Sequence, residues 1–137
     1  MLKLSKLADY SFILLIQMVT GSDKSWSAAE LASTTALPPP TVAKLMKLLS
    51  KSNIVTAQRG ATGGYRLANQ PTAITVASII EAIDGPIELT CCVNKREPVC
   101  AAQSFCVMRG GWDKINRVTR QALESVFLSD LINGTQP

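Results

Sequence analysis

The chain has 137 residues, of which 47% are hydrophobic, and a formal net charge of +4. This length suffices for one domain with a buried core, and no apolar run reaches the roughly 20 residues of a membrane-spanning helix. There is no histidine, nucleophile elbow, phosphate loop or carboxylate cluster, so an enzyme is not expected. Residues 31–70 hold five lysines and arginines and no acid, which indicates a surface that faces phosphates or a solvated basic face.

The chain is expected to begin with two helices. Residues 5–20 carry leucines at helical spacing, and Gly21 follows them as a stop. The next helix is predicted to begin at Ser27, because Ser27 and Glu30 have the spacing of a capping box, in which two side chains satisfy amides at the helix start.

A third helix is predicted over residues 39–51, after a tight turn at residues 36–38. Proline is tolerated in its first turn because the missing N–H would be unpaired there. One face is apolar (Val42, Leu45, Met46, Leu49) and the opposite face is polar (Thr41, Lys44, Lys47, Lys51). Two short helices joined by a tight turn are typical of a helix-turn-helix, whose second helix enters the major groove.

A β-hairpin is expected directly after this helix. Residues 54–58 and 65–67 are β-prone, and the glycine-rich residues 59–64 connect them. A hairpin in this position is a wing, and Arg59 and Arg66 could reach phosphates or the minor groove from it. The alternative is a surface hairpin beside the core.

Three further segments follow. Thr75 is expected to cap a helix over residues 76–83, which residues 84–86 terminate. A cysteine-containing loop comes next, with a short helix expected over residues 101–108.

Residues 112–131 are predicted as one long helix with an apolar stripe. Groove-reading proteins with a single recognition helix commonly pair to read two half-sites, so we expect a two-fold homodimer built on this helix. The stripe consists of Ile115, Val118, Ala122 and Val126, flanked by Leu123 and Phe127.

Together the elements predict a mainly α fold with a small β-hairpin. A winged helix-turn-helix is expected over residues 1–70, and a linker helix and cysteine loop over residues 71–110. A dimerisation helix over residues 111–133 and a loose tail over residues 134–137 complete the chain.

All four cysteines, Cys91, Cys92, Cys100 and Cys106, lie within the cysteine loop. Polar and turn-prone residues separate them, as is typical of ligands on a loop rather than of core cysteines. The start of the chain only partly matches a signal peptide, since Asp9 interrupts it. We therefore expect a cytoplasmic protein, in which disulfides rarely persist.

The spacing of the cysteines leaves several interpretations open. Structural zinc commonly uses two close pairs of cysteines or histidines, whereas the spacings here are one, eight and six. Iron–sulfur clusters are held mainly by cysteine thiolates and accept wider spacing. The residues alone are compatible with an iron–sulfur cluster, with zinc or a thiol switch, and with inert cysteines.

The chain resembles the winged-helix regulators that include IscR and NsrR, over essentially its whole length. The wing sequence followed by the cysteine loop is the specific part. The motifs are LADYSF (7–12), the Pro-Pro start of residues 39–51, RGATGGYRLA (59–68), ITVASIIEAIDGP (74–86), the cysteine loop and Trp112. The resemblance implies a cytoplasmic homodimer that binds palindromic double-stranded DNA and senses iron–sulfur status, nitric oxide or redox state.

The resemblance also implies a ligand set. Cys92, Cys100 and Cys106 match the three cysteines that hold an iron–sulfur cluster in the family, of a type that the sequence does not distinguish. Cys91 is additional and is interpreted as a spare or redox-exchanging thiol. The first two ligands are separated by seven residues, rather than the five of IscR.

The fourth ligand departs from the IscR pattern. Where IscR has a histidine, this chain has Arg109, which stays protonated and cannot bind iron. In NsrR-like members an aspartate near the start of the first helix is donated by the other subunit, and Asp9 matches that position. The alternative for Asp9 is a carboxylate that simply favours a helix N-terminus.

By the same resemblance, DNA contacts are expected at the start of the third helix and in the wing. Ala43 replaces an acidic residue of IscR, so the operator preference of IscR is not transferred. Pro40, Thr41 and Lys44 are assigned to the major groove, Arg59 to the wing, and Lys47 and Lys51 to phosphates.

The function expected is a DNA-binding transcription regulator, a repressor, that senses iron–sulfur cluster or redox status and controls iron–sulfur cluster assembly genes of the SUF type. One alternative is a nitric oxide or thiol redox sensor with the same fold. The other is an iron–sulfur carrier protein that does not bind DNA.

Overall fold

The computed structural model describes residues 2–21, 23–61, 63–93 and 100–134. Strands β1 (Val55–Gln58) and β2 (Gly64–Leu67) form an antiparallel hairpin. The expected mainly helical fold with a small hairpin is confirmed. The helices are α1 (Lys6–Gly21), α2 (Ala28–Thr35), α3 (Pro39–Lys51), the 3-10 helix η1 (Pro71–Ala73), α4 (Val76–Asp84), α5 (Gly111–Glu124) and α6 (Leu128–Gly134).

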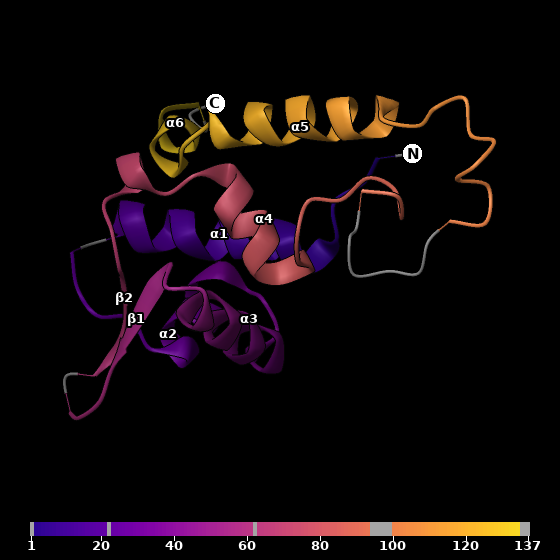
Figure 1. The fold of residues 1–137 in the computed structure, drawn as a ribbon. Helices are drawn as coiled ribbons and strands as arrows, with labels where there is room; N and C mark the ends of the chain where they lie inside the picture. The colour runs from indigo at the N-terminus through magenta and orange to yellow at the C-terminus, as the bar shows by residue number, and fades with distance from the viewer. Residues whose placement is uncertain (1, 22, 62, 94–99, 135–137) are drawn as a thin grey trace.

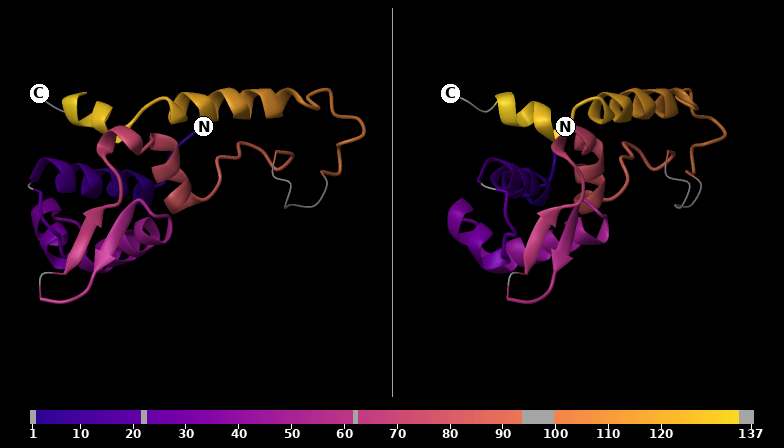
Figure 2. Two further views of the ribbon diagram at one scale, coloured as in Figure 1. Left: turned by 60° about the vertical axis from the view of Figure 1, so that its left-hand side comes forward. Right: turned by 90° about the vertical axis from the view of Figure 1, so that its left-hand side faces the viewer.

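The elements are stacked across the molecule (Figure 1). α5 and α6 lie along one side, α1 and α4 cross the middle, and α2, α3 and the hairpin form the opposite side. The hairpin projects from the body beside α3, while residues 87–93 and 100–110, between α4 and α5, extend beyond the body (Figure 2). The helix-turn-helix and the cysteine loop are therefore in different parts of the molecule.

One apolar core joins these layers. Burying a leucine or isoleucine side chain contributes roughly 1.5–3 kcal/mol, so this cluster is the main source of stability. The apolar face predicted for α3 is the buried one. The fully buried side chains include Leu14 and Leu15 of α1, Leu31 of α2, Val42, Leu45, Met46 and Leu49 of α3, Ile79 of α4 and Leu128 of α6.

The predicted capping box starts α2. The Ser27 hydroxyl accepts a hydrogen bond from the Glu30 amide, and the Glu30 carboxylate accepts one from the Ser27 amide, each at 3.0 Å. At the other end of α2, Ala36 adopts a left-handed conformation with φ of 58°. This conformation reverses the chain and allows α3 to begin three residues later at Pro39.

Trp26 extends the wing in a way that the sequence did not indicate. Its backbone pairs with Tyr65 of β2 through two hydrogen bonds, 2.9 Å and 2.7 Å long. Gly64 has φ of +145°, and an added Cβ there would lie 2.7 Å from the Trp26 carbonyl oxygen. Glycine at this position therefore permits the close approach of the two segments.

The prediction of one continuous helix over residues 112–131 is wrong. α5 ends at Glu124, and α6 begins at Leu128. Between them the Val126 carbonyl accepts a hydrogen bond from the Val76 amide, and the Leu128 amide donates one to Ile74, both at 2.8 Å. The chain leaves the helix because these extended pairings and the burial of Leu128 replace the helical hydrogen bonds.

The short helix expected over residues 101–108 is also not formed. This segment consists of successive turns, with local hydrogen bonds such as Gln103 N–H to Cys100 O and Phe105 N–H to Ala102 O. Its side chains are exposed, so no apolar face is buried to stabilise a helix. Of the expected tail, residues 135–137 lie outside the described residues.

Candidate nucleic-acid interface and cysteine site

α3 is the second helix of the helix-turn-helix, and its outer face is basic. Lys44, Lys47 and Lys51 are exposed, as is Pro40, while Thr41 is half-buried. The lysines follow one another at three- and four-residue spacing, so they lie along one side of the helix. The structure thus brings together the residues predicted for the major groove and for phosphates.

The start of α3 is open to a polar partner. Pro38 is its N-cap residue and provides no side-chain hydrogen bond, and two prolines follow. Because Pro39 and Pro40 have no N–H, this end offers few backbone donors, and it is the helix dipole that favours an anion such as phosphate here.

Among the described residues, the cations assigned to DNA have no ion-pair partner. In the described residues no ion pair involves Lys44, Lys47, Lys51 or Arg59; those formed involve Lys24, Arg66 and Arg120. Unpaired surface cations are available to phosphates at no cost of breaking an existing pair.

The two arginines of the wing have different surroundings. Arg59 is exposed beside the hairpin tip, as predicted for a wing contact. Arg66 instead faces the segment before α2, where its Nε donates to Ser25 Oγ at 3.0 Å and its Nη1 lies 3.8 Å from Asp23 Oδ1. Arg66 is therefore partnered within the chain, and its side chain remains exposed.

All four cysteines line one cavity of about 330 Å³ at the start of α5. Cys100 is half-buried, and the other three are exposed. The Thr90 hydroxyl lies 3.0 Å from Cys92 Sγ in a hydrogen bond. None of the described cysteines is in a disulfide. Thr90, Gln103, Arg109, Trp112 and Asp113 are also among the lining residues.

Asn116 of α5 connects the cysteine loop to the body. Its side chain is buried; Nδ2 donates to the Ile87 carbonyl and Oδ1 accepts from the Leu89 amide, both at 2.9 Å. The segment before Cys91 is therefore fixed to α5. Sequence reasoning missed this residue because an asparagine on an exposed helix carries no local signal for a contact 27 residues away.

The side chains that line this cavity include the ligand type that an iron–sulfur cluster requires. Four thiols around one cavity match a group held mainly by thiolates. In the described conformation, however, no three Cys, Asp or Glu residues stand close enough to hold one metal ion, as far as the described residues show. The residues thus fit the cluster in chemical type, and the loop must draw its thiols together to hold one.

The candidate fourth ligand Asp9 and the position of the IscR histidine, here Arg109, lie apart in this chain. Arg109 lines the cysteine cavity, whereas Asp9 is exposed in the first turn of α1 and does not line it. Asp113 is the acid that lines the cavity among the described residues, and the sequence comparison missed it.

α5 presents an uncovered apolar stripe on its outer side. Ile115 is 41% exposed and Val118 is 56% exposed, and Ala122 is exposed between them and the helix end. No helix in the described part of the chain is both long enough and apolar enough to cross a bilayer.

Comparison with known proteins agrees with this arrangement. A family model described as Rrf2, iron-dependent transcriptional regulator, matches residues 4–134. The chain is 24% identical to the HTH-type transcriptional regulator NsrR of Shouchella clausii over 132 residues, which cover 96% of this chain and 89% of that protein.

The fold is similar to that of several solved structures, of which two are described here. CymR, the global cysteine regulator of B. subtilis, has a TM-score of 0.73 and 29% identity, covering 99% of this chain and 100% of that one. T. potens IscR has the same fold, with a TM-score of 0.70 at 24% identity, covering 98% and 89%. These relatives are regulators of transcription and not enzymes. The chain belongs to the Rrf2 family of transcriptional regulators.

Proposed function

We propose that this DNA-binding regulator works in the cytoplasm, senses iron–sulfur cluster or redox status through its cysteine loop, and represses genes for iron–sulfur cluster assembly. The observation that carries the proposal is the cavity that all four cysteines line. Residues of the cysteine loop and of the proposed dimer helix α5, Trp112 and Asp113, line this cavity together.

In this proposal residues 1–70 bind DNA, residues 71–110 hold the cluster, and residues 111–133 dimerise. Pro40, Thr41 and Lys44 read bases in the major groove of a palindromic operator. Lys47 and Lys51 contact phosphates, and Arg59 contacts the backbone or the minor groove from the wing. The exposed basic face of α3 and its unpaired cations support this assignment.

Cys92, Cys100 and Cys106 are proposed to hold the cluster, and Asp9 of the partner subunit to complete its coordination. An iron–sulfur cluster supplies a redox-active, oxygen-sensitive group at this place. The side chain of Asn116 links residues 87–89 to α5 through two hydrogen bonds. A change in the positions of the thiols is therefore transmitted through this link and shifts α5. In a dimer built on α5, such a shift changes the spacing of the two α3 helices.

This coupling requires that the two states of the loop favour different dimer geometries, because a ligand shifts an equilibrium only through differential affinity.

The test is operator binding, measured without oxygen, for protein with and without reconstituted cluster. We expect a difference of at least about fivefold, the lower end of typical allosteric coupling, and its loss in Cys92→Ala. Equal binding by wild type in both states would refute cluster sensing while leaving DNA binding intact.

A thiol redox switch is the second candidate function. The adjacent Cys91 and Cys92 are exposed and line the same cavity as Cys100 and Cys106, and CymR is described as a regulator of cysteine. If this candidate holds, metal-free protein responds to a thiol oxidant, and Cys91→Ser abolishes the response. A nitric oxide sensor and a cluster carrier without operator preference are the remaining alternatives.

A further inference from the structure

Arg109 is the cation of the cysteine cavity. Among the described residues that line this cavity there is no other lysine or arginine, whereas Asp113 adds a carboxylate to the four thiols. Arg109 and Cys100 also line together a neighbouring cavity of about 500 Å³. The Arg109 amide donates a hydrogen bond to the Cys106 carbonyl oxygen at 3.2 Å. The turn after Cys106 therefore places this arginine beside the cysteines.

The guanidinium of Arg109 has no partner in the described part of the chain. The arginine side chains that form hydrogen bonds or ion pairs there are those of Arg66 and Arg120. Asp113 lines the same cavity, yet it forms no ion pair with Arg109 among these residues. The charge of Arg109 is therefore not offset by a neighbouring side chain.

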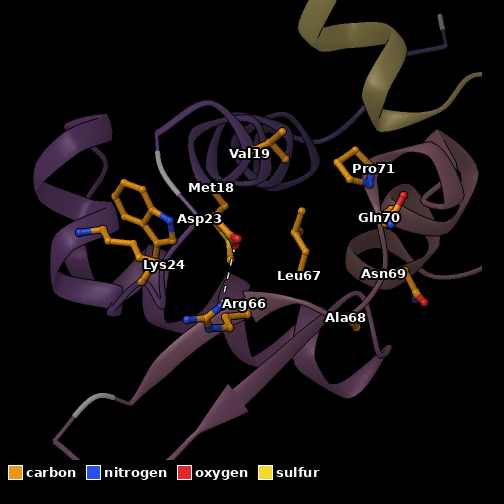
Figure 3. Close-up of a pocket in the computed structure, with 11 residues that line it drawn as sticks. Met18, Val19, Asp23, Lys24, Arg66, Leu67, Ala68, Asn69, Gln70 and Pro71 are labelled. Atoms are coloured by element: carbon orange, nitrogen blue, oxygen red, sulfur yellow. Dashed lines mark ion pairs between the residues drawn. The ribbon is translucent and has the colours of Figure 1, made fainter.

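The cavity beneath the wing differs in this respect. It has a volume of about 650 Å³ and lies between α1 and β2 (Figure 3). Lys24 of its lining pairs with Glu30 at 3.3 Å. Arg66 pairs with Asp23 at 3.8 Å, as the dashed line in the figure marks. Its cations are thus already engaged, whereas Arg109 remains available to a negatively charged group at the cysteines.

Such a group is expected at the cysteines if they hold a cluster. An iron–sulfur cluster bound by thiolates carries a net negative charge, and reduction by one electron makes that charge larger. A nearby cation therefore stabilises the reduced state more than the oxidised state. Net charge and hydrogen bonds to the sulfurs are among the factors that set the reduction potential of these clusters. Arg109 can supply both, because arginine stays protonated and has several N–H donors.

We infer that Arg109 raises the reduction potential of the cluster proposed for this cavity. The inference rests on the proposed function, and it gives Arg109 a role other than that of a ligand. Its guanidinium offsets part of the negative charge at the thiols. In the redox step one electron passes from an external reductant, such as dithionite, to an iron ion of the cluster. That ion changes from ferric to ferrous, and no bond is formed or broken.

The test is an anaerobic redox titration of the reconstituted full-length protein. Dithionite is the reductant, soluble mediators carry the electrons, and the visible absorption of the cluster is the signal. Arg109→Gln removes the charge, and we expect the equilibrium constant for reduction to fall by about threefold or more, which lowers the potential by about 30 mV at about 59 mV per tenfold. Arg109→Lys keeps the charge and is expected to keep a potential closer to that of wild type.

Arg117→Gln is the matched control, because it removes the same charge from an exposed position of α5 that does not line the cavity. We expect it to change the potential much less. Iron and sulfide are measured in every variant, so that loss of the cluster is not mistaken for a change in potential. If Arg109→Gln retains no cluster, Arg109→Lys decides: wild-type cluster content and potential support the role of the charge, and loss of the cluster overturns it.

Three results would overturn the inference while leaving the cluster in place. These are an unchanged potential in Arg109→Gln, an equal shift in Arg117→Gln, and a shift in Arg109→Lys as large as that in Arg109→Gln. Wild-type protein without iron and sulfide after reconstitution would instead overturn the proposed function and this inference together.

Discussion

Lys44 and Lys47 lie on the same exposed side of α3, yet different roles are proposed for them. Lys44 is nearer the start of the helix, where base edges are reached in helix-turn-helix complexes, and Lys47 is one turn further on. A base contact gives sequence discrimination, whereas a phosphate contact gives affinity without it. The two lysines are therefore a matched pair for separating these effects.

We predict that Lys44→Ala reduces the difference in binding free energy between the operator and a scrambled duplex by about 1–3 kcal/mol. Lys47→Ala should weaken binding to both duplexes alike and reduce the slope of log K against log salt by about 0.9. Fluorescence anisotropy at several salt concentrations measures both quantities. An equal loss on both duplexes for Lys44→Ala would assign it to phosphate.

For single residues, the sequence predicted the surroundings correctly where these depend on neighbours along the chain. The exposure of the α3 lysines follows from helical periodicity. Asn116, Asp113 and the backbone pairing of Trp26 were missed, because they depend on contacts with residues distant in the sequence or on the path of a loop. The hydrogen bond from Arg66 to Ser25 was missed for the same reason, because it joins distant segments.

The same distinction holds for the helices. The bounds of α2 and α3 were predictable because the capping box, the prolines and the apolar spacing agree locally. The break between α5 and α6 was not, since Val126 continues the helical spacing of Val118 and Ala122 in the sequence. The hydrogen bonds of Val126 and Leu128 to Val76 and Ile74 decide the structure there, and tertiary pairing overrides the local pattern.

We predict that Ser27→Ala lowers the free energy of unfolding by about 1 kcal/mol at neutral pH, the usual loss for an N-cap. Its hydroxyl accepts the Glu30 amide and cannot be replaced by a methyl group. Urea unfolding followed by circular dichroism measures the change. Ser33→Ala, the same change at an exposed position of the same helix, is the control, and an equal loss in both variants would argue against the cap.

The capping box also predicts a dependence on pH. The hydrogen bond from the Ser27 amide, aided by Lys24, lowers the pKa of Glu30 from its ordinary value of 4.5. A lowered folded-state pKa contributes stability above the ordinary value, and that stability is lost as the pH falls through the folded value. The difference in stability between wild type and Glu30→Gln should therefore be largest near neutral pH and shrink below pH 4.5; a constant difference would contradict this.

At the scale of the whole molecule, α5 lies on the side opposite α3 and the hairpin (Figure 1). A dimer built on α5 leaves both basic faces uncovered, which suits two half-sites of one duplex. The exposed Ile115 and Val118 are then the centre of the interface.

We predict that Val118→Glu converts the proposed dimer to a monomer and weakens operator binding, because a charge at an apolar interface is costly to bury. Val118 is exposed within the single chain, so the fold should be kept. Gln121→Glu introduces the same charge at another exposed position of α5 and is the control. Sedimentation velocity measures the assembly, and a dimeric Val118→Glu protein would place the interface elsewhere.

If the cysteine cavity holds an iron–sulfur cluster, as we propose, the purified protein contains both iron and acid-labile sulfide. The most direct test is the content of iron, acid-labile sulfide and zinc per chain in protein purified without oxygen, for wild type and Cys100→Ala. We predict iron and sulfide in near-equal amounts in wild type and their loss in Cys100→Ala. Zinc without sulfide, or no metal in wild type, would contradict the claim and favour a thiol switch at Cys91 and Cys92.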